Sequence, residues 1–101
     1  MEISEIIEFF RTRKFFLKEK FAVKKIGVFG SYSKCKEEDV SDIDIYVEFN
    51  IEELTLDKYL SLIEYFEKIF GRKVDLITKE GVESIRIPEI KKDIKESIKY
   101  A

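Results

Sequence analysis

Two aspartates, Asp42 and Asp44, are the residues of this chain whose type and spacing point most directly to chemistry. Ile43 separates them, and an alternating run that ends at Phe49 follows. In a β-strand, residues two positions apart project from the same face, so the two carboxylates would lie side by side. Neighbouring carboxylates repel each other unless a cation sits between them. Because Mg²⁺ prefers carboxylate and phosphate oxygens, the pair is a candidate site for a hard metal ion.

A glycine and a serine, Gly30 and Ser31, precede the aspartates, with ten residues between Ser31 and Asp42. Glycine lets a backbone approach a phosphate closely, and a serine hydroxyl with neighbouring N–H groups can donate hydrogen bonds to phosphate oxygens. Taken alone, such a pair after a strand is usually only a turn. Taken alone, an Asp-x-Asp in a strand is more often the polar face of an edge strand. The two features at this spacing favour a site for a phosphorylated ligand and a metal ion.

The pattern Gly30-Ser31, ten residues, then Asp42-Ile43-Asp44 resembles the signature of the nucleotidyltransferase superfamily that includes DNA polymerase β. The short chain is similar to the smallest branch, the minimal nucleotidyltransferases (MNT), which resemble antitoxins encoded beside HEPN-domain toxins. The resemblance implies that the glycine and serine hold the nucleotide's phosphates. It also implies that both aspartates are catalytic and bind Mg²⁺, with two ions expected and ATP as the substrate.

Three further positions take expected roles from the same resemblance. Lys34 lies in a stretch where family members often carry a basic residue, and its charge would neutralise phosphate. Cys35 stands where the family often has glycine, a departure that would alter the turn before the acidic loop. Asp75 lies in a predicted strand where the third metal-binding carboxylate is expected. Glu48 competes for that role, but it lies more than ~12 Å along the strand from Asp44.

Length and composition indicate one small folded domain. The chain has 101 residues, 45% of them hydrophobic, so it can bury a core, and we expect a single domain over residues 1–101. Its single cysteine excludes an internal disulfide and fits a reducing compartment. The start of the chain lacks the basic segment of a signal peptide. No apolar run approaches the ~20 residues of a membrane span, so we expect a cytoplasmic protein away from membranes.

Charge is distributed unevenly along the chain. Residues 11–25 carry seven basic side chains and one acidic one, whereas residues 37–57 carry nine acidic side chains and no basic one. A solvated helix face is the simpler explanation of the basic segment. A surface that binds an acidic partner or RNA is the sharper one. Because no aromatic side chains interleave with these charges as stacking platforms on a sheet, we expect no nucleic-acid binding.

The spacing of apolar residues predicts how helices and strands alternate. One helix is expected over Ile3 to about Lys20 with Ser4 as N-cap. A second is expected over 54–70 with Thr55 as N-cap and Gly71 as the residue that ends it, and a third over 89–100 after Pro88. Shorter helical pieces are expected over 32–36 and 84–87, and a turn over 79–83. Strands are expected over 25–29, 42–49 and 73–78. The fold class is therefore α/β (α+β), a small mixed sheet with helices on one face and the carboxylate face open. The resemblance implies a polymerase β-like nucleotidyltransferase core.

The resemblance implies a Mg-dependent protein adenylyltransferase that transfers AMP from ATP to a tyrosine hydroxyl of a HEPN-type toxin and so acts as its antitoxin. The chain has no histidine to act as a base, so metal activation of the hydroxyl is the simpler account. Because the core uses the whole chain, a protein partner would present the acceptor, in a homo- or hetero-oligomer. Two alternatives stay open: a non-catalytic antitoxin that masks its partner by binding, and a nucleotidyltransferase that acts on a small molecule or an RNA end.

Overall fold

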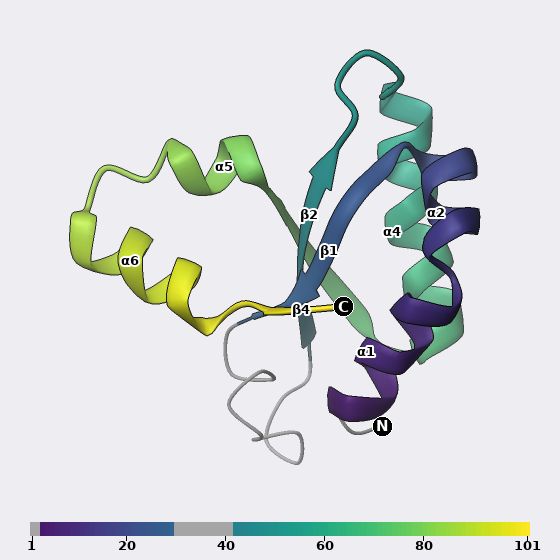
Figure 1. The fold of residues 1–101 in the computed structure, drawn as a ribbon, viewed down its shortest axis with the longest axis horizontal. Helices are drawn as coiled ribbons and strands as arrows, with labels where there is room; N and C mark the ends of the chain where they lie inside the picture. The colour runs from purple at the N-terminus through teal and green to yellow at the C-terminus, as the bar shows by residue number, and fades with distance from the viewer. Residues whose placement is uncertain (1–2, 30–41) are drawn as a thin grey trace.

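A four-stranded mixed sheet forms the centre of the computed structural model, which describes residues 3–29 and 42–101 (Figure 1). The strands are β1 (Val23–Val28), β2 (Asp42–Phe49), β3 (Lys73–Thr78) and β4 (Lys99–Tyr100), in the order β3-β2-β1-β4. β1 runs antiparallel to both β2 and β4, whereas β2 and β3 are parallel. The described helices are α1 (Ile3–Thr12), α2 (Lys14–Phe21), α4 (Leu56–Phe70), α5 (Lys79–Glu83) and α6 (Pro88–Ser97). The expected mixed sheet is confirmed.

The core lies between one face of the sheet and the helices α1, α2 and α4 (Figure 1). Side chains of β2 point alternately to the two faces of the sheet, and those that face this core are Ile43, Ile45, Val47 and Phe49, all buried. Phenylalanines supply much of the helical side of the core, because Phe10 of α1 packs against Phe66 of α4 with ring centroids 5.3 Å apart. The helices therefore hold β2 by its apolar face and leave its aspartates on the opposite face.

The elements that carry strong sequence signals agree with prediction. β2 and β3 have the predicted bounds, and β1 lies within a few residues of its predicted position. α4 begins after Thr55, whose side chain accepts a hydrogen bond from the Lys58 N–H (3.1 Å). It ends at Gly71, which adopts the left-handed conformation (φ 65°) that glycine tolerates best. Within the part of the chain that the structure describes, no helix is both long and apolar enough to cross a bilayer.

The single helix predicted from Ile3 to about Lys20 is wrong. Helix α1 ends at Thr12, whose hydroxyl donates to the Phe9 carbonyl (2.9 Å), and α2 begins at Lys14 after non-helical Arg13 (φ −107°, ψ 7°). The second helix does not continue the apolar face of the first, and its Phe15 is 75% exposed. Ser4 lies inside α1 and is therefore no N-cap.

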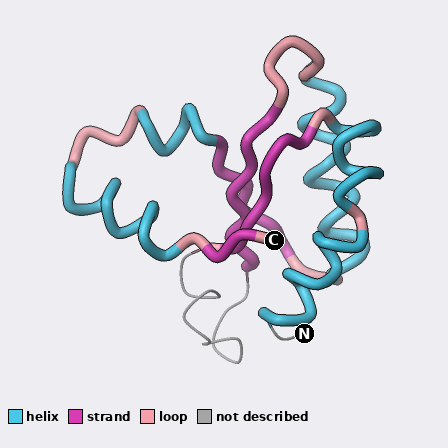
Figure 2. The backbone as a smooth tube through the Cα atoms, in the orientation of Figure 1, coloured by secondary structure: helices cyan, strands magenta, loops and turns pink. Residues whose placement is uncertain are grey.

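The C-terminal third differs most from prediction. Residues 79–83 form helix α5 where a turn was expected, because the Thr78 hydroxyl caps it by accepting from the Gly81 N–H (3.0 Å). Residues 85–87 are not helical, and α6 ends at Ser97 rather than continuing to Tyr100. The chain then forms β4 beside β1, as the tube in Figure 2 shows, and the Ala101 N–H donates to the Ile26 carbonyl (3.0 Å).

This C-terminal segment also changes which surfaces are open. α5 contacts β2 and β3 on the side of the sheet opposite α4 (Figure 1), and Glu83 joins α5 to α6 through Lys91 (3.2 Å) and Lys95 (2.7 Å). Tyr100 of β4 packs edge-on against Tyr46, which is only 5% exposed although it lies on the face that was expected to be open. The face opposite the core is therefore partly covered, not fully open.

Gly27 is required by the close approach of β4, and Gly27→Ala is expected to detach that strand. A Cβ at this position would lie 2.7 Å from the Lys99 carbonyl oxygen, a backbone atom that cannot move without displacing β4. We expect a loss of about 1–3 kcal/mol in the free energy of unfolding, as for other overpacked sites. Hydrogen exchange checks this result, since the amide of Ala101 should exchange faster while amides shared by β2 and β3 stay protected. Uniform exchange throughout the sheet would contradict it.

Candidate functional site

The register of β2 and β3 brings the three predicted carboxylates together. Asp44 is paired directly with Asp75 across the parallel ladder, and Asp42 lies two positions before Asp44 on the same face. Neighbouring strands are about 4.8 Å apart, so paired side chains on one face are immediate neighbours. Asp42 and Asp44 are half-buried, whereas Asp75 is exposed. We call Asp42, Asp44 and Asp75 the carboxylate trio, and the side of β2 and β3 that carries them the carboxylate face.

The charges of the two neighbouring aspartates act on Asp44. Partial burial, followed by the negative charges of Asp75 and then Asp42, raises the pKa of Asp44 from 3.8 to about 6. Burial and a like charge both disfavour the ionised form of a carboxyl group. A positive charge placed between the three side chains would therefore favour the ionised form of Asp44.

The donor set fits a divalent cation by its chemistry. Three carboxylates on adjacent strands supply the oxygen ligands that Mg²⁺ prefers, and phosphate oxygens of a substrate would complete such a shell. Within residues 3–29 and 42–101, no three His, Cys, Asp or Glu side chains are arranged closely enough to hold a metal ion as they stand. Repulsion between neighbouring carboxylates favours such an open arrangement, and side-chain rotation would have to close it around a cation.

Glu48, the competitor for the third position, lies elsewhere. Its carboxylate accepts a hydrogen bond from the Tyr46 hydroxyl (2.9 Å), and its strand partner is Lys25 of β1. Burial and the hydrogen bond to Glu48 raise the pKa of Tyr46 above its ordinary value, so the phenol stays a neutral donor. Glu48 thus has a local structural partner, whereas Asp75 is the strand partner of Asp44.

One neighbour of the site was missed by sequence reasoning. Lys73, the first residue of β3, pairs with Asp42 in the parallel ladder, and so an exposed ammonium group belongs to the carboxylate face. A lysine at the start of a strand carries no distinctive signal in the sequence. Only the register between β2 and β3 shows that it is next to the first aspartate.

The predicted phosphate-binding residues Gly30, Ser31 and Lys34, and also Cys35, lie outside the described residues. The described residue that immediately precedes them, Phe29, lies next to the site. β1 ends at Val28, and the N–H of Phe29 donates to the carbonyl of Asp44 (3.0 Å). Phe29, the residue before Gly30, is therefore hydrogen-bonded to the backbone of Asp44.

The raised pKa of Asp44 predicts that Asp44→Asn stabilises the metal-free protein at neutral pH. The folded pKa lies above the unfolded one, so the stability that Asp44 contributes is fully present below about pH 3.8 and is lost as pH rises through about 6. The difference between the two pKa values sets an upper bound of about 3 kcal/mol on the stability that the variant could gain. Solvent screening of a half-buried group reduces the expected gain at pH 7 to about 1 kcal/mol.

Urea unfolding with a chelator present, at several pH values between 4 and 8, measures this effect. The difference between variant and wild type should grow up to about pH 6 and then level off. Glu64→Gln on the exposed side of α4 is a matched control, which we expect to show no such growth. A gain that is the same at every pH would contradict the electrostatic explanation.

Comparison with known proteins gives consistent matches over most of the chain. Residues 5–101 match the model of the nucleotidyltransferase domain family. A relative from Methanocaldococcus jannaschii, provisionally named a protein adenylyltransferase, is 50% identical over 97% of this chain and 96% of its own length. The protein adenylyltransferase MntA of Thermococcus cleftensis is 40% identical over 83% of this chain and 84% of its own length.

Two solved structures share the fold. One, provisionally described as a minimal nucleotidyltransferase, has a TM-score of 0.71 and 23% sequence identity, and covers 98% of this chain and 95% of its own. The other is a crystal structure of a mutant toxin–antitoxin complex, MntA–HpeT, with a TM-score of 0.58 and 22% identity, covering 90% of this chain and 68% of its own. At such identities the likeness confirms the fold predicted from the sequence.

Proposed function

This chain belongs to the nucleotidyltransferase domain family, and we propose that it is a protein adenylyltransferase that acts as the antitoxin of a toxin partner. The acceptor we propose is a tyrosine hydroxyl of a HEPN-type toxin, and the nucleotide is ATP. Members of the family generally use a divalent metal ion and a nucleotide substrate. The observation that carries the proposal is the register of β2 and β3, which pairs Asp44 with Asp75 and keeps Asp42 beside them.

The reaction joins the acceptor oxygen to the α-phosphorus of ATP, breaks the bond between the α- and β-phosphates, and releases pyrophosphate. The hydroxyl proton leaves to solvent. In our proposal Asp42 and Asp44 hold Mg²⁺ together with the phosphates, and Asp75 completes the carboxylate set on the acceptor side. Two Mg²⁺ ions held there would neutralise phosphate charge and lower the pKa of the acceptor hydroxyl. Gly30, Ser31 and Lys34 are the proposed contacts to the phosphates.

The choice of acceptor rests on relatives. MntA of Thermococcus cleftensis is named a protein adenylyltransferase, and an MntA protein of similar fold is part of a toxin–antitoxin complex. We further propose that residues 1–101 act as one domain, and that the protein works in the cytoplasm, for which its single cysteine is the support.

ATP labelled at different phosphates tests this function. The toxin encoded beside this chain would be incubated with the protein, Mg²⁺ and ATP labelled at either the α- or the γ-phosphate. AMP transfer predicts that the α-label stays on the toxin and the γ-label leaves with pyrophosphate. Retention of the γ-label would identify a kinase instead. No label at all, with the toxin still inhibited, would favour an antitoxin that acts by binding alone.

The assignment of the third carboxylate can be tested by two matched variants. Asp75→Asn should lower the rate of AMP transfer by about 10²–10³-fold, the range found when a group that stabilises transition-state charge is removed. Glu48→Gln should leave the rate within about threefold of wild type, because Glu48 is bonded to Tyr46 rather than paired with Asp44. Initial rates with the labelled toxin give both numbers. A larger loss for Glu48→Gln than for Asp75→Asn would indicate that the third metal-binding carboxylate is Glu48 rather than Asp75.

A further inference from the structure

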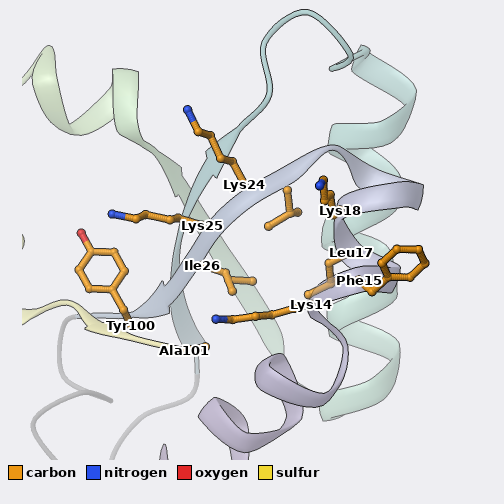
Figure 3. A pocket seen from close by; sticks show the side chains of 10 residues that line it. Lys14, Phe15, Leu17, Lys18, Lys24, Lys25, Ile26, Tyr100 and Ala101 are labelled. Carbon is orange, nitrogen blue, oxygen red and sulfur yellow. The ribbon is translucent and has the colours of Figure 1, made fainter.

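A groove of about 650 Å³ lies between α2 and the outer edge of β1, and none of the three aspartates lines it (Figure 3). Its floor is apolar and includes Leu17 of α2 and Ile26 of β1, both buried. No Asp or Glu side chain lines the groove. Lysines from both elements surround it, namely Lys14, Lys18, Lys24 and Lys25. We call this feature the lysine groove. It has the composition of a site for a ligand that is both apolar and acidic.

The lysine groove also exposes part of a strand edge. β4 pairs only with Gly27 and Val28 of β1, and the Ala101 N–H reaches Ile26. Among the described strands, none lies beside the outer edge of β1 over residues 23–25. An open strand edge offers backbone N–H and C=O groups to an added strand. The groove thus combines an apolar floor, a basic rim and a short pairing edge.

Two aromatic side chains mark the ends of the lysine groove. Tyr100 lies at one end, where the Lys25 ammonium group lies 5.4 Å from its ring centroid. Phe15 lies at the other end (Figure 3) and is 75% exposed, an unusual exposure for so large an apolar side chain. Because the rings are at opposite ends, they form no shared platform on which a base could stack. This arrangement favours an extended peptide over a nucleotide or RNA.

We propose that the lysine groove binds an acidic, extended segment of the protein partner, which adds a strand to the free edge of β1. Alternate side chains of such a segment would point to the apolar floor, and the acidic side chains between them would meet the lysines. Phe15 would gain apolar contact with the bound segment. The proposal rests on the proposed function only for the identity of the partner protein. The recognition of such a segment follows from the positive charge of the lysines, the apolar floor of the groove and the open edge of β1.

A synthetic peptide tests the groove without ATP or toxin, so its failure would leave the proposed AMP transfer untouched. The probe is a fluorescent nine-residue peptide that alternates glutamate and valine, titrated into the full chain. Reversing two rim charges, Lys14→Glu with Lys18→Glu, should weaken binding at least tenfold. Lys68→Glu with Lys92→Glu, which makes the same change of net charge outside the groove, should weaken it less than threefold. Equal losses in both variants would overturn the proposal, because they would show only attraction by net charge.

The strand-pairing part has its own readouts. Hydrogen exchange should slow at one or more amides of residues 23–25 when the peptide binds. The same peptide N-methylated at alternate amides should bind at least tenfold more weakly. Phe15→Ala should weaken binding several-fold while leaving thermal stability unchanged. Unchanged exchange with equal affinity of the methylated peptide would overturn strand addition.

Other occupants of the lysine groove give recognisable results. Self-association in sedimentation that disappears with Lys14→Glu and Lys18→Glu would show that a second copy of this chain occupies the groove, and would overturn the proposal. An oligouridine RNA that binds with the same dependence on these lysines, while the peptide does not, would overturn it as well.

Discussion

Replacing Asp44 with alanine should abolish AMP transfer and leave the protein folded. Asp44 is the centre of the carboxylate trio, with Asp75 beside it across the ladder and Asp42 on its own strand. In the proposed site its carboxylate would bind the metal ion together with Asp42 and Asp75, so a fall in rate of about 10³-fold or more is expected. Because burial and like charges raise the pKa of Asp44 to about 6, its loss should not destabilise the metal-free protein.

Single-turnover rates with the toxin as acceptor measure this loss, and urea unfolding of the same samples measures stability. Asp57→Ala is a control of the same type, since Asp57 is an exposed aspartate in the first turn of α4. It should keep wild-type activity. A variant at Asp44 that retained more than a tenth of the wild-type rate would show that the metal site lies elsewhere.

Phe10→Ala should cause a large loss of stability, about 3–5 kcal/mol in the free energy of unfolding. Its ring is fully buried and contacts Phe66 and Phe70 of α4 at centroid distances of 5.3 and 6.1 Å. These contacts join α1 to α4 over the core face of β2, and truncation would leave a cavity between them. Since small domains have about 5–15 kcal/mol of total stability, such a loss should unfold a sizeable fraction of molecules at physiological temperature.

Phe15→Ala is the matched control, because it removes the same side chain from the neighbouring helix α2, where the ring is 75% exposed. Its free energy of unfolding should change by less than about 0.5 kcal/mol. Urea titration followed by circular dichroism gives both values. Equal effects at the two positions would contradict the packing described for α1 and α2.

The parts of the fold that were predictable are those with strong local signals. β2 alternates strictly between buried and half-buried residues up to Tyr46, and α4 has an N-cap at Thr55 and a left-handed glycine at Gly71. The errors arise where tertiary contacts decide. A two-residue strand such as β4 has no periodicity of its own, and it forms because Gly27 admits its backbone and Tyr46 packs against its aromatic ring.

The same division applies to the candidate site. The period of a strand was enough to predict that Asp42 and Asp44 share a face. Their proximity to Asp75 follows from the register between β2 and β3, which no local pattern encodes, and it was expected only from resemblance to a family. Lys73 was missed for the same reason. The burial of Tyr46 depends on β4, which was not predicted.

The most direct test of the central claim is the intact mass of the toxin after incubation with this protein, ATP and Mg²⁺. The carboxylate trio predicts a mass increase of one or more AMP units on a tyrosine, absent when Asp42→Ala and Asp44→Ala are combined. The double variant should still bind the toxin if the lysine groove, which none of the three aspartates lines, holds the partner. An unmodified toxin that is nevertheless bound and inhibited by the wild type would contradict the claim, and would show that this protein inhibits the toxin by binding alone.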